Sequence, residues 1–169
     1  MATAVDICNM SLSHLGVEFI TALSDSTEPA RQCNLLYEPA RDQVLRDHPW
    51  GFAETSVELT VLPAVEPTGY TFAYTYPANC LHARNIYNSI VGAAPIDYKI
   101  VATAALDGKV IVTDFEDAVL IYTAAITDTT LFDASFITAF SWRLAADLAY
   151  PLTKKGTTAK SMQEAYSLY

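Results

Sequence analysis

The spacing of apolar residues changes from a helical period to an alternating one and back again, and this order limits the folds open to the chain. Apolar residues recur every three or four positions up to Asp47, and again after Asp133. Between these stretches they alternate with polar residues, most clearly over residues 70–76. The first period is typical of an amphipathic helix and the second of a half-buried strand. The sequence therefore predicts helices at both ends and strands in the middle.

Two helices are predicted ahead of the strands. The first covers residues 4–15, with Thr3 and Asp6 as capping residues and Gly16 as its stop. The second covers residues 27–47, where Pro39 should kink the helix or remove a hydrogen bond near Leu35. Its apolar stripe consists of Ala30, Cys33, Tyr37, Ala40 and Val44.

The end of the second predicted helix is rich in charge and stops abruptly. Glu38 and Arg41, and then Asp42 and Arg46, have the spacing of ion pairs along one helix face. Pro49 ends the helix, because the residue before a proline is pushed out of the helical region. We expect architectural residues here: charged side chains that hold the helix or a neighbouring subunit, and a tryptophan that anchors the turn from helix to sheet. Intrahelical surface pairs and an ordinary core tryptophan are the alternative. The residues concerned are Arg41, Asp42, Arg46 and Trp50.

The middle third is predicted to be an antiparallel β domain. Strands are expected at residues 57–62, 70–76, 98–104, 109–113 and 118–126. Asp107-Gly108 indicates a hairpin turn, and the last strand, apolar on both faces, should be central. The aromatic ladder of Tyr70, Phe72 and Tyr74 is our candidate for subunit contacts. Carbohydrate binding by the same ladder is an alternative.

Two further helices are predicted after the strands. One covers residues 134–150, with Asp133 as its capping residue and Pro151 as its stop. The other runs from about residue 158 to the chain end. The predicted fold class is α+β, in which residues 1–51 and 128–169 form an antiparallel helical bundle and residues 52–127 form an inserted β domain.

Composition excludes several classes of function. The net charge of −9 argues against tight binding to nucleic acid. Hydrophobic residues make up 51% of the chain, yet no apolar run reaches membrane-span length, so we expect burial in an assembly and no membrane. The three cysteines show no metal-binding or disulfide spacing, which indicates a reducing compartment.

The sequence offers little support for an enzyme. His14, His48 and His82 lack metal-ligand spacing, so we expect neither metal nor cofactor. Glu116 and Asp117, with Asp114 nearby, could serve a glycoside hydrolase if held at the required separation, but acidic turns are usually solvated.

Five segments, in this order, carry a resemblance to a known family. They are residues 7–16 (ICNMSLSHLG); 33–37 with 40–42, 45–46, 48–50 and 52–53; 74–81; 111–114 with Tyr122; and 132–133 and Phe136 with 144–149. Together they resemble the tail tubular protein A family of short-tailed phages, the head-to-tail adaptors. The likeness covers nearly the whole chain. Pro39, which interrupts the usual helical run, is a departure from the family pattern.

The resemblance implies a virion structural protein and no enzymatic activity. Members of the family form a homo-oligomeric ring, dodecameric, that joins the portal protein to the tail nozzle protein, tail tubular protein B, and extends the DNA channel. In some phages the tail fibres attach near that junction. The implied location is the tail or neck of the virion, after synthesis in the host cytoplasm. A neck or head-completion protein of a long-tailed phage and a tail-associated glycan hydrolase are the alternatives.

Overall fold

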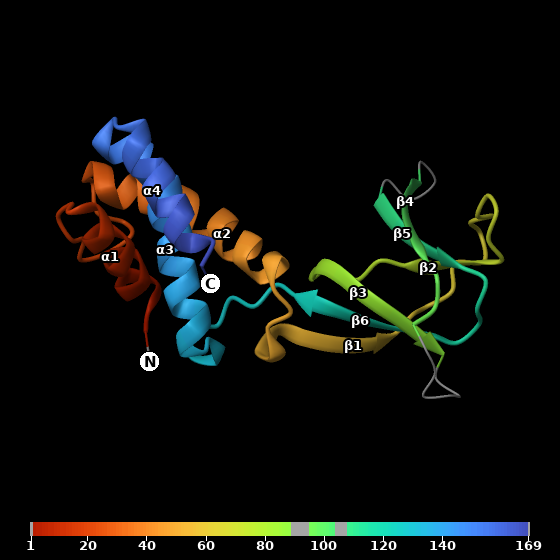
Figure 1. Cartoon of the computed structure of the whole chain (residues 1–169). Coiled ribbons are helices and arrows are strands. Elements are labelled where there is room, and N and C mark those ends of the chain that lie inside the picture. Colours follow the sequence, from red (N-terminus) through yellow and green to blue (C-terminus); the bar gives the residue numbers. More distant parts are fainter. Residues whose placement is uncertain (1, 89–94, 104–107, 169) are drawn as a thin grey trace. The chain divides into compact units, whose positions relative to one another are not determined.

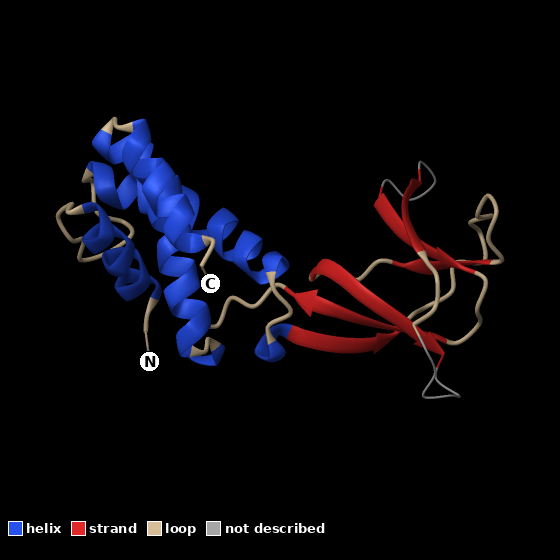
Figure 2. Cartoon of the chain, viewed as in Figure 1, coloured by secondary structure: helices blue, strands red, loops and turns tan. Residues whose placement is uncertain are grey.

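The computed structural model describes residues 2–88, 95–103 and 108–168. The chain forms two compact units, Met1–Phe52 with Ile126–Tyr169, and Ala53–Ala125. The first contains four α-helices, and the second contains two three-stranded antiparallel sheets, so the protein is of the mixed α+β class (Figure 2). We call them the helical unit and the β unit.

The helical unit is organised around its third helix. The four helices are α1 (Ala4–Leu15), α2 (Glu28–Asp47), α3 (Ala134–Thr153) and α4 (Gly156–Tyr166). α3 packs against each of the other three (Figure 1). Among the described residues, no helix is long and apolar enough to cross a membrane.

Capping side chains set where three of these helices begin. Thr3 and Asp6 form the expected capping box at α1, and Gly16 ends that helix in the left-handed conformation with φ of 66°. Thr27 caps α2, and Asp133 caps α3 by accepting a hydrogen bond from the Phe136 amide at 2.6 Å. The predicted stripe of α2 is buried throughout. These sequence predictions are confirmed.

The structure corrects two predictions about the helix ends. Pro151 does not stop α3, which continues to Thr153. Pro151 has no amide hydrogen, so the last turn loses only one helical hydrogen bond. The Thr153 hydroxyl donates to the Ala149 carbonyl, and Lys154, in the left-handed conformation, caps the helix. α4 begins at Gly156 and ends at Tyr166, before the chain end. Pro39 lies inside α2, which is helical from Glu28 to Asp47, and the kink expected there stays a prediction.

The β unit consists of two sheets of three strands. Sheet A has the order β1-β6-β3, from β1 (Glu54–Glu58), β6 (Ala118–Ala124) and β3 (Cys80–Asn88). Sheet B has the order β2-β5-β4, from β2 (Phe72–Thr75), β5 (Gly108–Thr113) and β4 (Lys99–Thr103). All strand pairs are antiparallel.

The predicted strands are partly right. β6 is central in its sheet, as its apolar sequence indicated. β4 and β5 pair antiparallel, but the turn expected at Asp107 lies outside the described residues. The first strand comes earlier than predicted, at Glu54–Glu58, and Val61 forms only an isolated bridge with Tyr74. β3 was not predicted, because polar residues interrupt its alternation and its pairing with β6 contains two irregularities.

Candidate functional site

Arg41 is a buried charge on α2. Its side chain is 7% exposed, and its Nε and Nη2 atoms reach the same Asp42 carboxylate oxygen at 2.8 and 2.7 Å. The expected partner Glu38 is 3.9 Å away and largely exposed. Arg46 lies exposed in the last turn of the helix. The pattern that predicted surface pairs thus missed the burial of Arg41, which makes this arginine a structural part of the helical unit.

Trp50 packs on the helical unit just after α2. Its indole N–H donates to the Val44 carbonyl at 2.8 Å. This bond satisfies one of the carbonyl groups at the end of α2 that lack a partner within the helix. Its ring meets Phe136 edge-on, with centroids 5.2 Å apart. Phe52 contacts the same Phe136 ring at 5.1 Å. Trp50 and Phe52 therefore hold the segment after α2 against α3.

A small polar group lies inside the helical unit near Arg41. The thiols of Cys8 and Cys33 are hydrogen-bonded to each other and are fully buried. This bond and burial raise the pKa of Cys8. The Tyr37 hydroxyl is buried without a hydrogen-bond partner, and burial raises its pKa to about 12. Burial therefore favours the neutral forms of the Cys8 thiol and the Tyr37 hydroxyl.

α4 is held to the rest of the helical unit by its last turn. The Tyr166 hydroxyl donates to Asp47 at 2.6 Å, and the Arg143 guanidinium lies over the Tyr166 ring at 5.9 Å. Burial and the Asp47 carboxylate raise the pKa of Tyr166. None of the residues in α4 is buried, so this contact and its packing on α3 keep the helix in place.

The predicted aromatic ladder is divided between the two faces of sheet B. Tyr74 is fully buried, and its hydroxyl donates to the Phe115 carbonyl at 2.8 Å. Phe72 is half-buried and lies 6.2 Å from the Tyr74 ring. Tyr70 instead precedes the strand and packs on Ala73, which faces the other way. Tyr74 is therefore part of the core and not available to a ligand or partner, whereas Tyr70 and Phe72 are partly exposed.

The acidic turn between β5 and β6 is exposed. Asp114 accepts hydrogen bonds from the amide and hydroxyl of Thr71, at 2.9 and 3.1 Å. Asp117 is in the left-handed conformation with φ of 53°. Asp117 and Glu58 line one hollow of about 220 Å³. Across the described ranges, no group of three metal-ligating side chains gathers at one place.

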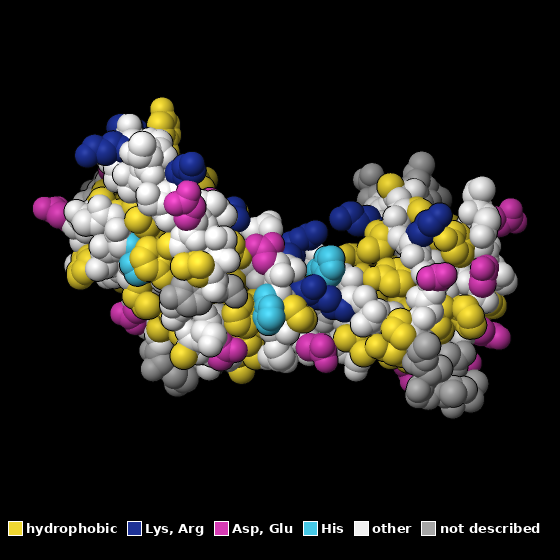
Figure 3. All heavy atoms as spheres, viewed as in Figure 1, with side chains coloured by type: hydrophobic (Ala, Val, Ile, Leu, Met, Phe, Trp, Pro, Cys, Tyr) yellow, Lys and Arg dark blue, Asp and Glu magenta, His cyan; other side chains and the backbone are white. Residues whose placement is uncertain are grey.

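Exposed apolar side chains occur in both units (Figure 3). In the helical unit, Phe19 is 66% exposed and borders a hollow of about 300 Å³ with Met10 and His14. His14 stacks on Trp142 with centroids 3.6 Å apart, and its Nε2 lies 3.1 Å from the Ser141 hydroxyl oxygen. Such apolar surface is typical of protein contact sites.

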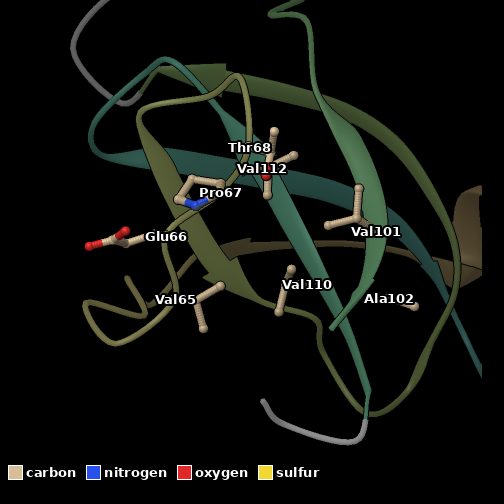
Figure 4. A pocket seen from close by; sticks show the side chains of 8 residues that line it. All are labelled: Val65, Glu66, Pro67, Thr68, Val101, Ala102, Val110 and Val112. Atoms are coloured by element: carbon tan, nitrogen blue, oxygen red, sulfur yellow. The ribbon is translucent and has the colours of Figure 1, made fainter. Parts of the chain in front are cut away.

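In the β unit, strand β4 carries two neighbouring exposed apolar side chains. Ile100 and Val101 are 42% and 36% exposed. A hollow of about 350 Å³ lies beside this strand (Figure 4). It is lined by β4, by β5 and by the loop at residues 65–68. The alternating pattern predicted strands here, but no local signal indicates which strand becomes an edge.

Comparison of the chain with models of known families gives no match, and comparison with curated proteins gives none either.

Proposed function

We propose that this chain is a head-to-tail adaptor of a short-tailed phage. Copies would form a ring, dodecameric by analogy with the family it resembles, between the portal protein and the tail nozzle protein. In this proposal the N- and C-terminal helices form an antiparallel bundle and the β unit is an insertion. The protein would reside in the tail or neck of the virion, with tail fibres near the same junction in some phages.

One observation carries this proposal: the segments that resemble the adaptor family supply much of the core. From residues 7–16 come Ile7, Cys8, Ser11 and Leu12, all fully buried. From residues 144–149 come Leu144, Ala145, Leu148 and Ala149, also fully buried. The resemblance therefore involves the residues that determine the fold, rather than a surface motif.

Surface properties support the same role. Leu35, Phe19 and Tyr150 in the helical unit are each more than 60% exposed, and such side chains are commonly buried by a partner. The net charge of −9 suits a channel through which DNA passes, because like charge weakens its binding to the wall.

Assembly with the portal is the decisive test. The purified chain is examined by light scattering and electron microscopy, alone and with the portal protein of the phage that encodes it. We expect rings that dock on the portal, or monomers that assemble only when the portal is present. A chain that stays monomeric and never associates with the portal contradicts the proposal. A ring that binds a connector of a long-tailed phage instead favours the neck protein.

A glycan hydrolase is the second candidate, favoured by the hollow where Glu58 and Asp117 lie together. Two carboxyl groups are the usual catalytic equipment of such enzymes. Release of sugars from capsular or wall glycan, lost in Asp117→Asn or Glu116→Gln, would favour this function over the adaptor.

A further inference from the structure

Among the residues that the structure describes, each sheet of the β unit has one covered edge and one open edge. The outer side of β2 is covered, because Leu62 donates to the Ala73 carbonyl at 2.8 Å and Thr75 donates to the Thr60 carbonyl at 3.0 Å. On the outer side of β3, Ile96 donates to the Ile86 carbonyl at 2.8 Å. Within the described ranges, no strand lies on the outer side of β1 or of β4.

From these two open edges we infer that β1 of one copy of this chain pairs antiparallel with β4 of the next copy. An unpaired strand presents a row of backbone donors and acceptors that another strand can complete. The inference rests on the proposed ring and names the surfaces through which its copies would join.

The two strands match in length and charge. Each has five residues, β1 with the sequence ETSVE and β4 with KIVAT. When all five residues are aligned antiparallel, Lys99 lies opposite Glu58, and Ile100 lies opposite Val57. Ile100 and Val57 are 42% and 36% exposed in the single chain, so their pairing would cover apolar surface that is now in water. Opposite charges and apolar residues in facing positions stabilise a strand pair.

The faces of the two sheets also agree in this alignment. In sheet A, Val57 pairs with the fully buried Leu120 and so lies on the core face. In sheet B, Ile100 pairs with the fully buried Ile111 and also lies on the core face. Joining β1 to β4 would therefore continue one apolar face across both sheets. A shift of one residue would break this match, because it turns every side chain to the other face.

Charge also selects between the possible pairings. Two copies of β1 paired antiparallel would place Glu54 of one copy opposite Glu58 of the other, and facing like charges destabilise a strand pair. Pairing β1 with β4 avoids this repulsion. Because the two surfaces differ, every copy keeps one free β1 and one free β4, and such head-to-tail contacts close into rings when the rotation permits.

The basic residue at the β4 edge is positioned for this contact. The Lys99 ammonium lies 5.6 Å from the Tyr70 ring centroid, which holds it on the face of the sheet that carries Val101 and Val112. This is the face on which the aligned Glu58 would lie. The hollow beside Val101 shows that the loop at 65–68 leaves space over the strand (Figure 4).

Cysteine cross-linking tests the predicted register. Val57→Cys and Ile100→Cys are made in the full chain, whose three native cysteines are buried. The variants are mixed and oxidised with oxidised glutathione, alone and with portal protein. We expect a covalent dimer only in the mixture, because each variant supplies one half of the contact. Glu66→Cys, in an exposed loop, replaces Val57→Cys as the control and should give no dimer with Ile100→Cys.

Charge reversal tests the pairing without a covalent bond. Lys99→Glu or Glu58→Lys should weaken association roughly fivefold or more, and the double variant Lys99→Glu/Glu58→Lys should recover most of that loss. Lys155→Glu and Glu18→Lys are the matched controls, because they make the same charge changes at exposed positions of the helical unit. Circular dichroism and tryptophan emission establish that each variant is folded.

The outcomes separate this inference from the proposed function. Rings that form normally in the charge variants and give no Val57–Ile100 cross-link overturn the inference and leave the adaptor role intact. Cross-linked chains that never bind a portal support the edge pairing and contradict the adaptor role. If folded variants show neither association nor cross-link, with or without portal, both ideas fail.

Discussion

The helical unit and the β unit differ in how completely they satisfy the hydrogen bonds of their own backbone. In the helical unit, Phe136 touches four other aromatic rings, and side chains cap the starts of α1, α2 and α3. In the described part of the β unit, two strand edges stay open, and apolar side chains are exposed along them. The first unit therefore pairs most of its own backbone groups, whereas the second has strand edges that another chain can complete.

The largest effect is expected from Phe136→Ala. This fully buried ring lies 4.6 Å from Phe132 and 5.2 Å from Trp50, so its removal leaves a cavity at the centre of the helical unit. We expect a loss of about 4 kcal/mol in the free energy of unfolding. Tryptophan emission in urea measures it, because Trp50 and Trp142, the two tryptophans of the chain, both lie in this unit.

A surface change is the control for that experiment. Leu131→Ala removes a side chain that is 53% exposed and should shift the urea midpoint little. Equal losses in the two variants would contradict the view that the aromatic cluster stabilises the helical unit.

The matching change in the β unit is Ile111→Ala. Ile111 is fully buried on β5, and its truncation should cost about 3 kcal/mol. Hydrogen exchange should quicken in sheet B, while the tryptophan-reported midpoint stays unchanged. Lys109→Ala, at an exposed position of the same strand, is the control. A tryptophan midpoint that falls with Ile111→Ala would mean that the two units unfold as one, and the contrast between them would not extend to stability.

Asp42→Asn tests the buried charge on α2. The change removes the carboxylate that binds the Arg41 guanidinium at 2.7 Å and should cost about 2 kcal/mol, as expected for a hydrogen bond to a charged group. Adding Arg41→Met should recover part of this loss, because the unpaired charge is then removed. Glu38→Gln, whose side chain is 75% exposed, should change the urea midpoint little. If Asp42→Asn and Glu38→Gln lower the urea midpoint equally, the Arg41–Asp42 pair stabilises the fold no more than an exposed surface pair does, which contradicts the prediction.

The smallest effect is expected from the pH dependence of His14. Burial lowers the pKa of His14 in the folded chain below the usual 6.5, so the unfolded chain binds the proton more readily. Stability should therefore fall as the pH drops from above 6.5 through the native pKa. The tryptophan-reported midpoint, measured against pH, should fall less in His14→Gln. His82→Gln, in the β unit, is the control; an identical pH profile in His14→Gln and the native chain would contradict the prediction.

The sequence predicted the helical unit better than the β unit, for a physical reason. The ends of α1 depend on Thr3, Asp6 and Gly16, which act within one helical turn and can be recognised locally. The predicted end of α3 was wrong because a proline in the last turn costs the helix only one hydrogen bond. Strand pairing is decided by distant residues, so neither the existence of β3 nor the open edges could be derived from local patterns.

The candidate site shows the same limit. The ion-pair spacing paired Arg41 with Glu38, whereas its close partner in the structure is the adjacent Asp42. The burial of Arg41 depends on the packing of the other helices, which spacing does not reveal. The alternation of Tyr70 with Phe72 and Tyr74 suggested one aromatic face, yet Tyr70 packs on the opposite side because it precedes the strand.

The order of the elements has a consequence for synthesis on the ribosome. α1 and α2 touch each other little and pack mainly against α3, which leaves the ribosome only after the entire β unit. The apolar faces of the first two helices therefore stay uncovered while residues 53–125 are made and can already form their strands. The β unit should fold first on the growing chain, and the first segment made should be among the last to reach its native packing. Conditions that slow translation through α3 should then favour aggregation of the nascent chain.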